Sequence, residues 1–202
     1  MMKSMILRLF NAARRKRAQA VAGFCLIAMV LLPLPRVGFA EEVCFRNLQV
    51  CVQKPDSRNY HVYQAPADIT YDEVIVNGGL LLRAESKTGS KFLKLSVVKA
   101  DMTDIYREDF YRGYVYGSIK SKEELGRLIF RTETRKFADS AVTTFEEEGR
   151  VGQLAYVAKH KIQLKGNFIY HLNTGRISAA SGGLEGESDL LGFLDSLTFL
   201  KE

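Results

Sequence analysis

Residues 153–164, QLAYVAKHKIQL, alternate between two kinds of side chain along the chain. One set is mostly apolar and falls on one face of an extended strand: Leu154, Tyr156, Ala158, His160, Ile162 and Leu164. The other set is polar and falls on the opposite face: Gln153, Lys159, Lys161 and Gln163. This two-residue period predicts a half-buried strand in an antiparallel sheet, with one face packed and one face in water.

The segments around this strand continue the pattern toward the C-terminus. We expect a strand over 141–145 leading into an acidic turn over 146–152, then return strands over 168–172 and 177–181 separated by a turn over 173–176. A loop over 182–188 precedes a final helix over 189–200, which Ser188 can cap. In that helix Leu190, Leu194 and Leu197 would face inward.

The N-terminal half predicts a second meander of short strands. Strands are expected over 60–64, 69–76, 80–86 and 91–99, and the Asn-Gly-Gly of 77–79 is a strong hairpin signal. Residues 69–76, ITYDEVIV, are rich in the β-branched side chains that favour strands.

The middle of the chain changes to helical spacing. Residues 103–120 place Tyr106, Phe110 and Tyr114 at intervals of four, which is the spacing of one helix face. Gly113 and Gly117 weaken the second half of this helix, for which a strand is the alternative. A second helix is predicted over 121–137, where Ser121 and Glu124 form a capping box.

This order of elements predicts an α+β domain. Its sheet is expected to be mainly antiparallel, made of an N-terminal hairpin and meander and then a C-terminal meander. Central helices and the C-terminal helix pack against it.

Residues 1–40 have the three parts of a secretory signal peptide. A basic start is followed by an apolar run and by small residues at Gly38 and Ala40, which predicts cleavage after Ala40. The apolar run has about 15 residues, fewer than the roughly 20 that a membrane span needs. The alternatives are a membrane anchor formed by residues 20–35 and a twin-arginine signal, although the usual serine or threonine before the arginine pair is missing.

Removing residues 1–40 also changes the charge of the chain. They hold seven basic and no acidic residues, so residues 41–202 keep 22 basic against 23 acidic side chains. A nucleic-acid-binding domain would need a basic footprint, and none remains. The remaining 162 residues are the size of one globular domain.

The two cysteines of this domain predict a disulfide. Cys25 leaves with the signal peptide, and Cys44 and Cys51 are an even pair in an oxidising compartment. A turn at Asn47-Leu48 would place the two cysteines opposite each other. A redox pair, a zinc site and a lipid attachment site each lack the spacing or neighbours that they require.

The aromatic residues of 106–116 are the candidate binding surface. Tyr106, Phe110, Tyr111, Tyr114 and Tyr116 combine with arginines there, a composition enriched at interfaces. The alternative is that they are core residues covering the sheet. His160, on the apolar face of its strand, joins this set as a candidate binding residue, with a hydrogen-bonded core histidine as the alternative.

Motifs for catalysis, metal binding or cofactor binding are missing from the sequence. There is no nucleophile elbow, no metal-ligand spacing among the three histidines, and no phosphate-loop lysine near the glycine-rich 182–188. We therefore expect no catalytic residues, no metal and no cofactor.

The leading hypothesis is an exported, non-enzymatic binding or accessory protein of the bacterial cell envelope, located in the periplasm or secreted. Its partner would be an envelope protein or a small ligand, with membrane contact only if residues 1–40 stay attached. The alternatives are a periplasmic hydrolase whose site is assembled from residues distant in sequence, and a self-associating structural subunit of the envelope.

Overall fold

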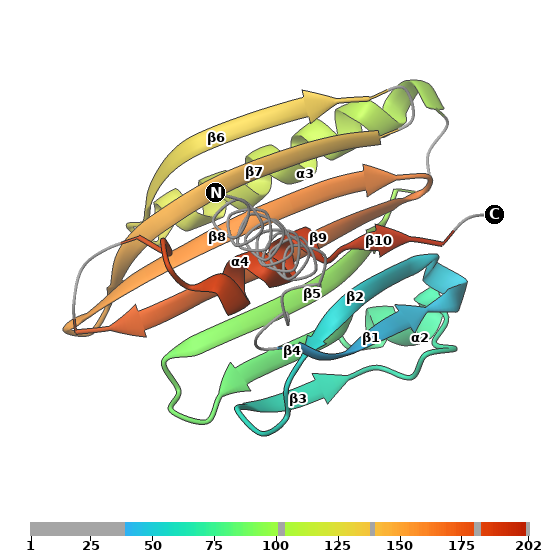
Figure 1. Ribbon diagram of the computed structural model, residues 1–202. Helices are drawn as coiled ribbons and strands as arrows, with labels where there is room; N and C mark the ends of the chain where they lie inside the picture. Colours follow the sequence, from blue (N-terminus) through green and yellow to red (C-terminus); the bar gives the residue numbers. More distant parts are fainter. Residues whose placement is uncertain (1–38, 101–103, 138–139, 180–182, 201–202) are drawn as a thin grey trace, which may run out of the picture. The chain divides into compact units, whose positions relative to one another are not determined.

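The computed structural model describes residues 39–100, 104–137, 140–179 and 183–200 (Figure 1). The predicted signal peptide lies outside this range except for Phe39 and Ala40, and so does the alternative anchor at 20–35. The described part is an α+β domain built on antiparallel sheets, as the sequence predicted. Among the described residues, no helix is both long enough and apolar enough to cross a membrane.

A seven-stranded antiparallel sheet is the centre of the fold (Figure 1). Its order is β3-β4-β5-β9-β8-β7-β6. The strands are β3 (Tyr60–Gln64), β4 (Leu80–Ser86), β5 (Lys91–Lys99), β6 (Leu128–Lys136), β7 (Ser140–Val151), β8 (Leu154–Lys165) and β9 (Phe168–Ser178). The alternating strand predicted over 153–164 is β8, between β9 and β7 in the sheet.

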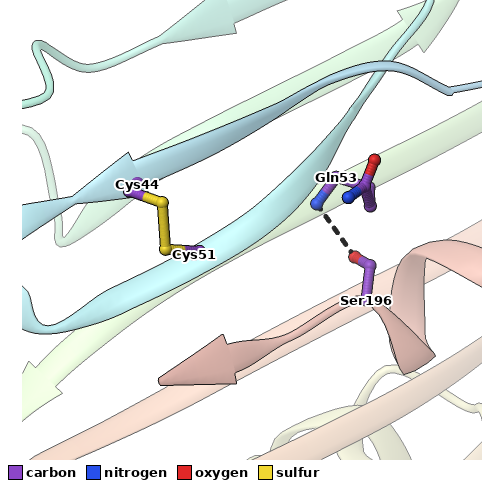
Figure 2. Close-up of a disulfide and its surroundings, with 4 residues drawn as sticks. All are labelled: Cys44, Cys51, Gln53 and Ser196. Atoms are coloured by element: carbon purple, nitrogen blue, oxygen red, sulfur yellow. Dashed lines mark hydrogen bonds between the residues drawn. A yellow bond between two sulfur atoms is a disulfide. The ribbon is translucent and has the colours of Figure 1, made fainter. Parts of the chain in front are cut away.

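A smaller sheet joins the two ends of the domain. Its order is β1-β2-β10, with β1 (Phe39–Phe45), β2 (Val50–Pro55) and β10 (Thr198–Phe199). Cys44 lies directly opposite Cys51 and is bonded to it, so the predicted disulfide is confirmed (Figure 2). The turn between them differs from the prediction: it is a 3₁₀ turn, η1 (Arg46–Leu48), closed by Gln49 with a φ of 53°.

The helices cover both faces of the large sheet. They are α2 (Tyr71–Val76), α3 (Asp104–Glu124) and α4 (Ser188–Asp195). Side chains of α3 pack on Phe145, Ile162 and Ile169, whereas α4 packs with the opposite face of the sheet and with β2. We call these the α3 face and the α4 face (Figure 1).

Polar contacts fix α4 and the residues that follow it. The Ser196 hydroxyl donates to the Phe193 carbonyl at 2.8 Å and accepts from the backbone N–H of Gln53 at 3.1 Å (Figure 2). At the other end, the Lys91 ammonium lies 2.6 Å from Glu187 and 3.1 Å from Asp189. Glu187 of the predicted glycine-rich loop therefore serves to attach the loop to the sheet.

The predicted strand over 69–76 is wrong, and so is the hairpin at 77–79. Residues 71–76 form α2, whose first turn is held by a capping box: the Thr70 hydroxyl accepts from the Glu73 N–H, and the Glu73 carboxylate accepts from the Thr70 N–H. This local cap outweighs the strand preference of the β-branched residues. The glycines end the helix instead, and a Cβ on Gly79 would lie 2.3 Å from the Val97 carbonyl oxygen.

The predicted second helix over 121–137 is also wrong. The helix α3 runs without a break through Gly113 and Gly117 to Glu124, and the Ser121 hydroxyl donates to Ser118 within it. Gly126, at a φ of 73°, then reverses the chain, which is the usual role of glycine after a helix. The chain returns as β6, an edge strand paired with β7.

Two predicted turns are parts of long strands. The acidic residues 146–148 lie within β7, and the turn comes at Gly152. Residues 173–176 lie within β9, because Gly175 fits beside Phe92 and the Val157 carbonyl, where a Cβ would have no room. The final helix is shorter than predicted: α4 begins without a side-chain cap from Ser188 and ends at Asp195, although Leu190, Leu194 and Leu197 are buried as expected.

Candidate functional site

The structure divides the six candidate binding residues into an outer and an inner group. Tyr106 and Tyr116 point away from the sheet, with 61% and 65% of their surface exposed. Phe110 and Tyr114 are partly buried under α3. Tyr111 and His160 are buried, and His160 has no exposed surface.

Tyr111 attaches α3 to the sheet. Its hydroxyl donates to the Ile162 carbonyl at 3.0 Å and is hydrogen-bonded to the Thr143 hydroxyl at 2.8 Å. Thr143 in turn pairs with Thr134 of β6 at 2.9 Å. Burial raises the pKa of Tyr111, so the phenol stays protonated and keeps its donor. Tyr111 therefore has a structural role, which is to hold α3 against β7 and β8.

A chain of buried and partly buried polar side chains lies beside it on the α3 face. His160 Nδ1 is 2.9 Å from His171 Nε2, and His171 Nδ1 is 3.2 Å from the Tyr114 hydroxyl. On the other side, His160 Nε2 is 3.4 Å from Glu147 Oε1, which also accepts a hydrogen bond from Tyr156 at 2.6 Å. We call these five residues the histidine network.

The sequence did not place the two histidines together; the register of the sheet does. Ile162 pairs with His171, and His160 pairs with Asn173, so the histidines are diagonal neighbours on one face. Phe145 stacks on His160 with ring centroids 4.3 Å apart. Glu147, expected in a turn, comes from the same strand as Phe145 and is only 1% exposed.

One arrangement of protons serves the whole histidine network with both imidazoles neutral. Tyr114 donates to His171 Nδ1, His171 Nε2–H donates to His160 Nδ1, and His160 Nε2–H points at the Glu147 carboxylate. Each ring nitrogen then has the role that its neighbour requires. The last contact is too long and misaligned for a full hydrogen bond, so its contribution is mainly electrostatic.

The pKa shifts agree with this arrangement. Burial lowers the pKa of His160, and the Glu147 carboxylate restores only part of it. The pKa of His171 falls well below its ordinary value mainly because of burial, and the charges of Lys122, of Lys94 and of His160 when it is protonated act in the same direction. Burial raises the pKa of Glu147, but its contacts with His160 and Tyr156 lower it by more. The network holds one negative charge that its donors stabilise.

This geometry gives the histidine network a structural character. Its central imidazole is sealed between Phe145, the sheet and α3. Among the described residues, no three histidine, cysteine or acidic side chains are arranged to hold a metal ion. What the network can do chemically is bind α3 to the sheet in a way that depends on protonation.

A groove on the α4 face is the more accessible candidate site. It has a volume of about 520 Å³, within the range of small-molecule sites. Alternating residues of β7 and β8 form its floor, among them Val142, Thr144, Lys161 and Gln163. Its walls come from the end of β6 with Phe137 and from the segment that follows α4, with Leu197 and Phe199. We call it the β6–β8 groove.

Most charges in the β6–β8 groove are paired. Lys159 lies 3.1 Å from Glu146, and Arg135 lies 2.8 Å from Glu133. Lys161 differs: its ammonium donates to the Leu194 carbonyl at 3.0 Å and forms no ion pair with any carboxylate of the described residues. Burial lowers the pKa of Lys161, and the neighbouring Asp195 offsets part of that effect.

Sequence reasoning placed Lys161 on the polar face of its strand but missed the groove. Two of the groove's walls, β6 and β10, come from segments that the sequence predicted to be helical. The only sequence feature that could have indicated the groove is the position of Lys161, which alternates with apolar residues in the middle of a long strand.

Comparisons with known proteins add little to this picture. No model of a known protein family matches the chain, and no curated protein matches it. A crystal structure from Bacteroides thetaiotaomicron VPI-5482, determined at 1.50 Å resolution, is similar at 10% sequence identity with a TM-score of 0.44. The match covers 77% of this chain and 47% of that one, so the chain spans about half the length of its structural neighbour.

Proposed function

We propose that this protein is an exported, non-enzymatic binding protein of the bacterial cell envelope, and that the β6–β8 groove holds its ligand. The observation that carries the proposal is the groove itself: an open site of about 520 Å³ with apolar walls and a lysine on its floor. A few polar groups among apolar side chains are typical of small-molecule sites.

Export is supported by two observations. The signal-like pattern of residues 1–40 precedes the domain. The Cys44–Cys51 disulfide is of a kind that persists in oxidising compartments such as the periplasm. Cleavage after Ala40 would remove the first two residues of β1 and leave the pairing of Glu41 through Phe45 with β2 in place.

The test of export is expression of the full chain in a Gram-negative bacterium, followed by fractionation and intact-mass measurement. We expect a periplasmic protein that begins at Glu41 and lacks two hydrogens because of the disulfide. A full-length protein in the inner-membrane fraction would instead support the anchor, and a cytoplasmic protein with two free thiols would contradict export.

The test of the groove uses N-phenyl-1-naphthylamine, a neutral apolar dye that fluoresces when it leaves water. We expect the purified domain to bind the dye, and Thr144→Trp, which fills the floor of the groove, to abolish binding. Lys94→Trp places the same side chain on the opposite face of the sheet and should leave binding unchanged. Dye binding that is absent, or equal in both variants, would exclude the groove as the binding site.

In the other form of this hypothesis the partner is an envelope protein, which would bind to the outer surface of α3. Tyr106 and Tyr116 are exposed there and available to a partner. Tyr106→Ala and Tyr116→Ala are therefore informative in a pull-down from periplasmic extract. Tyr111→Ala is not, because Tyr111 is buried and its loss would loosen the helix.

The two alternatives have less support. A hydrolase that uses His160 would need α3 to move, since that side chain has no exposed surface. Self-association through strand edges is opposed by the charged residues of the edge strand β6, which include Arg131, Glu133 and Arg135. Hydrolase activity that His160→Ala removes, or concentration-dependent sedimentation, would revive the respective alternative.

A further inference from the structure

We infer that the β6–β8 groove selects a small, single-chain amphiphile with one anionic head group, and that the ammonium of Lys161 binds that head group. This inference rests on the proposed function of the groove and adds the chemical class of its ligand. It is argued from the ion pairs of the groove, the free donors of Lys161 and the apolar walls.

The pattern of ion pairs in the groove leaves the ammonium of Lys161 available to an anion. Five charged residues line the groove: Glu133, Arg135, Lys159, Lys161 and Asp195. Arg135 and Lys159 each have a carboxylate partner within 3.1 Å, whereas Lys161 has none among described residues. When Glu146, the partner of Lys159, is counted with these five, the six charges sum to zero, so the groove would attract an anion through the unpaired ammonium of Lys161 and not through a net charge.

Lys161 also has donors to spare. An ammonium group has three N–H donors, and one of them is used by the Leu194 carbonyl. The side chain is partly buried at the floor of an open groove, so its remaining donors are left to water or to a ligand. A carboxylate in the groove would accept a charge-assisted hydrogen bond from them, the strongest kind available to an ammonium group.

Apolar side chains flank this ammonium. Phe137 is 59% exposed, a large aromatic surface in water beside a groove. Leu197, Phe199 and Val142 line the same space. An apolar ligand body would cover these side chains and gain the favourable transfer from water that accompanies burial. An anionic head and a short apolar tail therefore match the two kinds of surface that the groove offers.

Asp195 is the side chain that opposes this ligand. Its carboxylate is exposed and acts on the charge of Lys161. Removing its charge should leave the fold intact and increase the attraction of the groove for an anion. It thus provides a second, independent variant.

The experiment is displacement of N-phenyl-1-naphthylamine from the purified domain by three ligands of equal chain length: decanoate, decanol and decyltrimethylammonium. We expect decanoate to bind at least tenfold more tightly than the other two. Lys161→Gln should remove that preference while decanol binding stays the same. The exposed Lys94→Gln, on the α3 face, is the matched control and should change nothing. Asp195→Asn should strengthen decanoate binding about twofold to threefold.

The outcomes separate the inference from the proposed function. If the dye binds in the groove but the three ligands compete equally, or if decanoate preference survives Lys161→Gln, the groove remains a binding site and the inference is wrong. If the dye does not bind, the proposed function fails first. If the Lys161→Gln variant does not fold, the test rests on Asp195→Asn. An unchanged affinity of Asp195→Asn for decanoate would then overturn the inference. Binding of phosphatidylglycerol vesicles in preference to decanoate would also overturn it, since it would assign the surface to a membrane.

Discussion

The two faces of the seven-stranded sheet use polar residues in opposite ways. On the α3 face, Glu147 and His160 are fully enclosed and connected to one another. On the α4 face, Lys159 and Lys161 of the same strands reach an open groove. The strand β8 contributes alternate residues to both faces, so the difference comes from what covers each face.

The comparison shows that the elements covering a face of the sheet determine how much free energy a charged side chain on that face costs. A buried carboxylate is tolerated only with donors around it, and Glu147 has Tyr156 and His160. A lysine with spare donors is tolerated where water or a ligand can reach it. Four predictions would break or sharpen this contrast, and we give them from the largest expected effect to the smallest.

The apolar core of the α4 face should give the largest effect. Phe193→Ala removes a fully buried ring and leaves a cavity, which should lower the free energy of unfolding by about 3–5 kcal/mol. Chemical denaturation measures it. Phe137→Ala, which removes an exposed ring from the groove, is the control and should change stability by less than about 0.5 kcal/mol. Equal losses in the two variants would mean that the groove wall is part of the core.

Glu147→Ala tests the histidine network. It leaves the partly buried Tyr156 hydroxyl without its acceptor and the buried His160 Nε2 without the carboxylate that faces it, so we expect a loss of roughly 2–4 kcal/mol in the free energy of unfolding. Glu148→Ala, the neighbouring residue on the opposite face, should have little effect. A small loss for Glu147→Ala would show that water enters the network and replaces the carboxylate.

Acidification should weaken the domain through the same network. The pKa values of His160 and His171 are lowered in the folded state from an ordinary value of 6.5 by burial, so below that value the unfolded chain binds more protons. Their contribution is complete above pH 6.5 and is lost as the pH falls.

Each histidine should contribute a slope of up to about 1.4 kcal/mol per pH unit below 6.5. The lowered pKa of Glu147 acts in the same direction at more acidic pH. Denaturation between pH 7 and 5 with His171→Gln should show a shallower slope than wild type, and the exposed His61→Gln should not. A slope that is unchanged in His171→Gln would contradict the neutral arrangement of the network.

Tyr111→Phe should have the smallest effect. It removes the hydrogen bonds to Ile162 and Thr143 but keeps the ring, so a loss of about 1 kcal/mol is expected. Hydrogen exchange of the α3 amides should rise with it. Tyr116→Phe, on the exposed side of the same helix, serves as the control for a hydroxyl that does not touch the sheet.

Segments whose local pattern and tertiary setting agree could be predicted from the sequence. The alternation of 153–164 gave β8, the four-residue spacing of Tyr106, Phe110 and Tyr114 gave α3, and the paired cysteines gave the disulfide. In each of these most of the repeating side chains become buried or partly buried, although Tyr106 and Leu154 at the ends of their elements stay exposed.

The misassigned segments depend on partners far away in the chain. Residues 128–136 carry a helix-like pattern, but β7 offers them an edge to pair with. The acidic 146–148 look like a turn until the histidine network provides partners for Glu147. For the same reason neither the meeting of His160 with His171 nor the β6–β8 groove could be predicted, since both depend on strand register.

The pairing of β10 with β2 has a consequence for the order in which the domain folds. Thr198 pairs with Cys51 and Phe199 with Val50, so the disulfide hairpin, which is made early, obtains its third strand from residues that follow it by almost 150 positions. Until then one edge of β2 has no strand beside it. The disulfide can keep β1 and β2 in register before β10 is added. It thereby preserves the edge of β2 to which a strand about 150 residues downstream must bind.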